Sequence, residues 1–206
     1  NALHTDSSDE NANADLWIHL YIRGKGFESL GHMDISYQGI IYSYGCHDPL
    51  HRTLGGSLGD GVLIEADEKE FLNISSEKDE KMIISYGLQL SEDDRKRFET
   101  NLQKLKERTV PWHCAYETDH KSEDYASRVY KATHCKLYKF TSGKFKTYFV
   151  ATTNCVLLAD SLIHTKDFKL VSPTGMITPG SYLAFLDQAY HQNTKVIART
   201  LRKVSI

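Results

Sequence analysis

The segment from His32 to Tyr44 constrains the fold of this chain more than any other stretch. The runs His32–Tyr37 and Ile40–Tyr44 are both rich in β-branched and aromatic residues, and only Gln38-Gly39 separates them. Two such runs joined by two residues that end in glycine predict a tight β-hairpin. The apolar run Trp17–Ile22 precedes this hairpin and predicts another strand.

The rest of the chain alternates strand and helix signals, which predicts an α+β fold. Ser91 followed by three acidic residues is a helix start, and apolar residues spaced i, i+4 after Cys155 predict a buried helix. Residues 1–15 are polar and are predicted to be a disordered leader or linker, and residues 16–206 a single domain. Further strands are predicted at 62–72, Met82–Leu90 and Val196–Val204, a hairpin at Cys135–Phe140 and Lys146–Ala151, and further helices at 123–131 and after Pro179.

Composition excludes several functional classes. The 206 residues carry a formal net charge of -2, so nothing indicates attraction to nucleic acid. No apolar run approaches the roughly 20 residues that span a bilayer, so we expect no stable membrane insertion. The four cysteines are too few for a disulfide scaffold, which leaves either one Cys114–Cys135 bridge or reduced thiols.

Cys155 and His32 are the residues best suited to covalent chemistry. Thr153 or Asn154 can cap the helix that starts at Cys155, where free N–H groups and the macrodipole stabilise a thiolate. The same N–H groups could hold an oxyanion during acyl transfer. His32 begins a strand directly after Gly31, which permits close approach of another segment. Taken alone, each residue is better explained as core packing, and only the pair points to chemistry.

A catalytic histidine needs a partner that orients its ring. A two-residue turn at Gln38-Gly39 places His32 opposite Gly45, so the partner is sought among residues 43–48. His47 has the better strand alternation, and Asp48 is the alternative. Three adjacent Cys-His pairs occur at 46–47, 113–114 and 134–135, but they lack the spacing of zinc ligands. We therefore expect neither a metal nor a cofactor.

Several short motifs together resemble the circularly permuted papain-like (NlpC-type) cysteine hydrolases. The opening Gly31-His32-Met-Asp-Ile-Ser with Ile41-Tyr-Ser-Tyr-Gly45 resembles their "GH…YG" start. Asn154-Cys155 followed by Thr178-Pro179-Gly180 resembles their "NC…TP" ending. The strand-to-helix passage from Tyr86 is also similar, and the resemblance spans roughly residues 16–190. Histidine before cysteine is the permuted order.

The resemblance implies a permuted papain-like fold, with an antiparallel, partly barrel-like sheet and the Cys155 helix packed against it. It implies a cysteine peptidase or amidase that cleaves peptidoglycan peptides outside the cytoplasm, as a remodelling enzyme or a secreted antibacterial effector. Cys155 would be the nucleophile and His32 the general base, with Asn154 and Tyr44 supporting the site. An immunity or inhibitor protein would then be a further partner. The alternatives are an acyltransferase or lipid deacylase of the lecithin:retinol type, and a non-catalytic binding module.

Overall fold

The computed structural model describes residues 3–6, 13–22, 30–53, 55–77, 82–163, 179–192 and 195–204. Nine strands form one antiparallel sheet in the order β1-β11-β7-β2-β3-β4-β6-β9-β8, and β5 and β10 form a separate two-stranded ribbon. In this strand order, β1 and β8 are the two outermost strands of the large sheet. Together with five α-helices in the described residues, it confirms the predicted α+β class.

The strands and helices have the following bounds. The strands are β1 Leu3–Asp6, β2 Leu16–Ile22, β3 Leu30–Tyr37, β4 Ile40–Gly45, β5 Leu58–Asp60, β6 Val62–Asp67, β7 Met82–Leu88, β8 Thr109–Pro111, β9 Lys136–Phe140, β10 Thr147–Phe149 and β11 Val196–Val204. The α-helices are α1 Glu68–Glu77, α2 Glu92–Lys106, α3 Tyr125–Thr133, α4 Cys155–Ile163 and α5 Pro179–His191. Thr178, which is part of the motif before α5, lies outside the described residues.

The predicted hairpin is confirmed and forms the middle of the sheet. β3 and β4 pair antiparallel, and Gln38 and Gly39 take positive φ angles of 51° and 78°. Positive φ at both central residues is the type I′ geometry that suits the right-handed twist of paired strands. This turn fixes the register of β3, the strand that carries His32.

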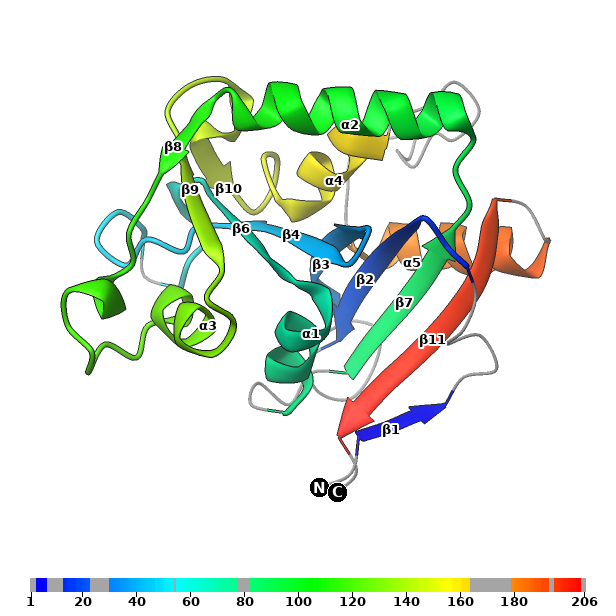
Figure 1. The fold of residues 1–206 in the computed structure, drawn as a ribbon, viewed down its shortest axis with the longest axis horizontal. Coiled ribbons are helices and arrows are strands. Elements are labelled where there is room, and N and C mark those ends of the chain that lie inside the picture. Colours follow the sequence, from blue (N-terminus) through cyan, green and yellow to red (C-terminus); the bar gives the residue numbers. More distant parts are fainter. Residues whose placement is uncertain are drawn as a thin grey trace.

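Helices cover both faces of the sheet, so two core clusters form. Residues of α2, α4 and α5, such as Phe98, Leu158 and Leu186, pack with one face of β2 and β3. Residues of α1 and α3, such as Phe71 and Val129, pack with the opposite face. Figure 1 shows α2 lying along the top of the molecule with α4 directly beneath it. The helix that begins at Cys155 is therefore buried, as predicted.

Three segments differ from the sequence prediction. Residues 68–72 continue as helix α1 rather than strand, because the Asp67 carboxylate accepts a hydrogen bond from the Glu70 N–H at 3.0 Å and caps the helix. β9 and β10 do not pair with each other: β9 joins β6 and β8, and β10 joins β5. Residues 3–6, within the segment expected to be disordered, form β1 by backbone pairing with β11.

Glycine at position 61 permits a close approach that holds the site region together. A Cβ atom there would collide with the Phe145 carbonyl oxygen and lie 2.8 Å from the Tyr44 hydroxyl oxygen. These two groups are hydrogen-bonded to each other at 2.9 Å. We expect Gly61→Ala to lower the free energy of unfolding by about 2 kcal/mol or more, since overpacking a filled site forces backbone shifts. Urea denaturation would measure this, and an unchanged midpoint would contradict the packing. Lys69→Ala, at an exposed position, is the control.

Candidate active site

Strand β3 places His32 and Asp34 on one face of the sheet, because residues two apart in a strand point the same way. The Nε2 atom of His32 lies 2.7 Å from Oδ1 of Asp34 and 3.2 Å from Oγ of Ser43 on β4. The Asp34 side chain is fully buried, whereas that of His32 is 23% exposed. The carboxylate therefore holds the imidazole at one nitrogen while part of the ring remains accessible.

Cys155 is the first residue of α4 and lies against the same imidazole. The thiol is buried, with 4% exposure, and it lies close enough to His32 to contribute to the raised pKa of that imidazole. As the first helical residue, Cys155 has a backbone N–H that lies among those without an acceptor inside the helix. The structure thus brings together two residues that lie 123 positions apart in the sequence.

The charges at this site favour an imidazolium. Burial of the His32 ring opposes protonation, but the Asp34 carboxylate and the Cys155 sulfur raise the pKa of His32 to about 10. Burial likewise opposes ionisation of Asp34, yet the charge of His32 and hydrogen bonds from His32, Ser43 and Tyr21 hold the pKa of this carboxyl below its usual value. His32 and Asp34 are therefore an ion pair at neutral pH.

His47, the predicted orienting residue, lies in the same cleft as His32 but stacks against another ring. Its ring centroid is 4.9 Å from that of Tyr125. A Cβ atom at Gly45 would lie 2.5 Å from Cε1 of His47, so this glycine makes room for the imidazole. The Nε2–H of His32 donates instead to the carboxylate of Asp34, a residue that sequence reasoning missed. The signal that could have found Asp34 is its i+2 position on a predicted strand.

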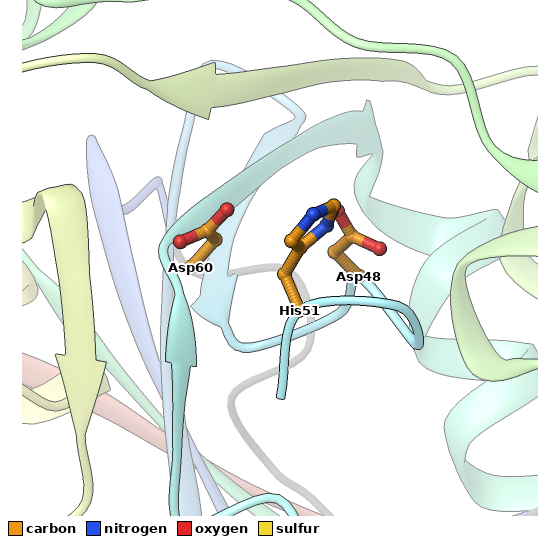
Figure 2. Close-up of side chains that lie close together, drawn as sticks. All are labelled: Asp48, His51 and Asp60. Atoms are coloured by element: carbon orange, nitrogen blue, oxygen red, sulfur yellow. The ribbon is translucent and has the colours of Figure 1, made fainter. Parts of the chain in front are cut away.

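Asp48, the alternative third residue, belongs to a different cluster. Figure 2 shows Asp48, His51 and Asp60 close together. Their possible ligand atoms all lie within 4.8 Å of one another. Oδ2 of Asp48 lies 2.8 Å from Nδ1 of His51 and 2.8 Å from Nζ of Lys139, which is also 2.7 Å from Asp60. The Lys139 ammonium thus already supplies the positive charge for both carboxylates. This cluster anchors the loop after β4 to β9.

Tyr44 and Asn154 are the two residues predicted to support the site, and both have defined contacts within the protein. The Tyr44 hydroxyl donates to the Phe145 carbonyl, and its ring packs edge-on against those of Phe140 and Phe145. Burial raises the pKa of Tyr44 far above its usual value. The Asn154 side-chain oxygen accepts from the Leu157 N–H at 3.1 Å, while its amide donates to a carbonyl at position 150. Asn154 is therefore the N-cap of α4 and positions Cys155.

Loss of this cap should affect the helix that begins at Cys155. We expect Asn154→Ala to lower the free energy of unfolding by about 1 kcal/mol, as for other helix N-caps. Asn154→Asp should recover most of that loss, because its carboxylate also accepts from Leu157 and suits the positive end of the helix dipole. Chemical denaturation of the three proteins would test this, and equal stabilities would contradict the capping role.

A cleft of about 420 Å³ opens beside His32. It is formed by the ends of β3 and β4, the loop that follows β4, helix α3 and the segment after β10. The lining residues are Tyr21, Gly31, His32, Gly45, Cys46, His47, Arg52, Gly55, Gly56, Tyr125, Arg128, Tyr148 and Val150. Cys155 is not among them. Burial is the main cause of the raised pKa of the Tyr148 phenol, and the charge of nearby Cys155 adds to it. The thiol is buried and does not line the cleft.

The remaining thiols differ from Cys155 in their surroundings. All four cysteines are free, so the Cys114–Cys135 bridge does not form. Cys114 and Cys135 lie in the core cluster under α1 and α3, and burial raises the pKa of each. Cys46 lines the cleft, and its thiol donates to the Gly56 carbonyl at 2.8 Å. Cys155 alone contacts an imidazole that is itself held by a carboxylate.

No protein-family model, curated protein or solved structure matches this chain. Within its described residues, no helix is long and apolar enough to cross a membrane.

Proposed function

We propose that this protein is a cysteine-dependent amide hydrolase with a permuted papain-like arrangement of its site. The observation that carries the proposal is the contact of Cys155, at the start of α4, with the imidazole of His32, whose Nε2 is 2.7 Å from Asp34. A thiol becomes a nucleophile when a neighbouring base takes its proton and a third group orients that base. The proposal assigns Cys155, His32 and Asp34 to these three roles.

The reaction follows from these positions. His32 holds the proton that Cys155 gives up, and the thiolate of this ion pair attacks the amide carbonyl carbon to form a C–S bond. The resulting oxyanion accepts a hydrogen bond from the Cys155 backbone N–H. The imidazolium then protonates the leaving nitrogen as the C–N bond breaks, which leaves a thioester. Water, deprotonated by His32, attacks the thioester and releases the carboxylic acid and the thiol.

Peptide amides of peptidoglycan are the proposed substrate, and the proposed location is secreted, periplasmic or at the cell wall. Both rest on the motif resemblance rather than on the geometry. An inhibitor or immunity protein would be a natural partner for a secreted effector of this kind. Because Cys155 is buried and is absent from the residues that line the cleft, the proposal requires the thiol to become accessible beside His32 when substrate binds.

An exposed apolar ribbon favours a second candidate, a lipid deacylase or thioester-mediated acyltransferase. Leu58 on β5 and Phe149 on β10 are register partners and are 40% and 41% exposed. Val150, which directly follows Phe149 and lines the cleft, is 50% exposed. Apolar side chains gathered at the rim of a cleft can hold an acyl chain or rest on a lipid surface. The same Cys155 and His32 would then cleave an ester.

The two candidates separate by substrate. The protein would be incubated with purified peptidoglycan fragments and with lipid ester vesicles, and products and Cys155 thioesters identified by mass spectrometry. New amino groups with a Cys155 acyl-enzyme support the amidase, and released fatty acid supports the deacylase. Absence of any Cys155-dependent product from both substrates would overturn the hydrolase proposal and leave the non-catalytic binding module.

A further inference from the structure

The cleft beside His32 is lined by cationic side chains and by no acidic one among its described residues. Arg52 comes from the loop after β4, and Arg128 comes from α3 on the other side. His32 and His47 add two imidazoles, of which His32 is protonated at neutral pH. A chain with a formal net charge of -2 therefore places two guanidinium groups on the cleft beside the proposed nucleophile's base.

The backbone of Arg52 is fixed although its side chain is exposed. Arg52 forms an antiparallel bridge with Gly59, and the neighbouring backbone bonds from Thr53 N–H to the Leu58 carbonyl and from Asp60 N–H to the His51 carbonyl measure 2.8 and 2.9 Å. A Cβ atom at Gly59 would lie 2.8 Å from Cβ of Arg52, so this glycine allows the close approach. The loop therefore presents Arg52 to the cleft in a defined place.

The guanidinium of Arg52 also acts on the cleft interior. Burial raises the pKa of the Cys46 thiol in the cleft wall, and the positive charge of Arg52 partly opposes that rise. On the far side, the Arg128 guanidinium carbon lies 5.8 Å from the ring centroid of Tyr125. A guanidinium presents several N–H donors in one plane, which suits the two oxygens of a carboxylate or phosphate.

We propose that Arg52 forms an anion subsite and that the substrate carries a carboxylate or phosphate close to the bond that Cys155 attacks. This inference rests on the proposed function of Cys155 and adds the charge of its substrate. Arg52 would bind the anionic group and orient the acyl carbon, so neutral analogues of the same shape would react more slowly. Arg128 extends the same positive surface across the cleft.

Alkylation of Cys155 by reagents that differ only in charge tests this without knowledge of the substrate. The rates for iodoacetate and iodoacetamide, and for N-bromoacetylglycine and its amide, would be measured from the Cys155 peptide by mass spectrometry. We expect Arg52→Gln to lower the anionic-to-neutral rate ratio about threefold to fivefold, the effect of losing an exposed ion pair. Arg52→Lys, which keeps the charge, should retain most of the ratio. Arg97→Gln, at an exposed position of α2, is the matched control.

The unmodified protein gives a second readout. Added salt should slow only the anionic reagents, because it screens the exposed guanidinium. Glycerol phosphate and N-acetylglycine, added as competitors, identify the preferred anion by which of them slows iodoacetate more. Rate ratios that are equal in wild type, Arg52→Gln and Arg97→Gln would overturn the anion subsite while leaving the proposed nucleophile intact. Failure of every reagent to modify Cys155 would contradict the nucleophile itself, and the subsite with it.

Discussion

Replacement of Cys155 by alanine is expected to lower hydrolysis by at least ~1,000-fold, because the proposed covalent intermediate forms on its thiol. The side chain is small and buried, so the folded protein should persist with a modest loss of stability. The variant should still bind substrate, since the cleft residues remain. Turnover of the identified substrate, with equilibrium binding measured in parallel, would separate the two effects.

Cys135→Ala is the matched control for this experiment. Cys135 is equally a buried free thiol, but it lies in the core cluster under α1 and α3. Its loss should leave turnover unchanged within about twofold after correction for the folded fraction. If Cys155→Ala and Cys135→Ala had the same activity, Cys155 would be a core residue and the hydrolase proposal would fail.

The hairpin and the helix that begins at Cys155 could be predicted from sequence because local signals specify them. Gln38-Gly39 requires positive φ and thereby sets the register of β3 and β4. Asn154 before an apolar stripe marks the start of α4 and exposes the helix N-terminus at Cys155. Neither signal states that the two segments meet. That contact depends on α4 packing against β3, which is a tertiary property.

The orienting residue could not be predicted from the turn alone. Counting across Gln38-Gly39 directs attention to β4 and the loop beyond it, where His47 and Asp48 stand. In the structure, Asp34 on the same strand as His32 makes the bond, and β4 contributes only Ser43. Counting residues across the turn finds partners on β4 only, so it misses a partner two residues away on the same strand. Asp48 is unsuitable because His51 and Lys139 already bind its carboxylate.

The misassigned elements share a physical cause. Residues 146–151 and the end of segment 68–72 carry apolar and aromatic side chains, which strands favour. A strand, however, also needs a neighbouring strand with which its backbone can pair. After β6, the Asp67 cap favours a helix that buries Phe71 and Leu72. After β9, the chain reverses through Gly143, with φ of 77°, and β10 pairs with the loop strand β5.

Replacement of Asp34 by asparagine should reduce turnover on the order of 10²–10⁴-fold, since the imidazole loses the charge that orients and stabilises its protonated form. Asp34 acts through His32, so its removal should also change the pH dependence. With Asp34, the pKa of His32 is about 10, and activity that needs the imidazolium should decline only near that pH. In Asp34→Asn the alkaline limb should move down toward the ordinary histidine pKa of about 6.5.

The free energy of unfolding should also fall as the pH rises and His32 loses its proton. A histidine whose pKa is raised by folding stabilises the native state fully below its ordinary pKa, and this contribution is lost as pH rises through the folded value. In the wild type the His32 contribution therefore falls between about pH 6.5 and about pH 10. Asp34→Asn should flatten this fall, because the folded and unfolded pKa values of His32 become closer.

Asp48→Asn and His47→Ala distinguish the orienting role from a general effect on the site. Asp48 holds the loop after β4 and His47 packs on Tyr125, so either change can lower stability or substrate binding. Neither touches the carboxylate that raises the pKa of His32, so both variants should keep the alkaline limb of the wild type. Activity profiles and the NMR titration of His32 would be recorded for all three variants. If the limb moved in His47→Ala and stayed in Asp34→Asn, then His47 rather than Asp34 would orient the base.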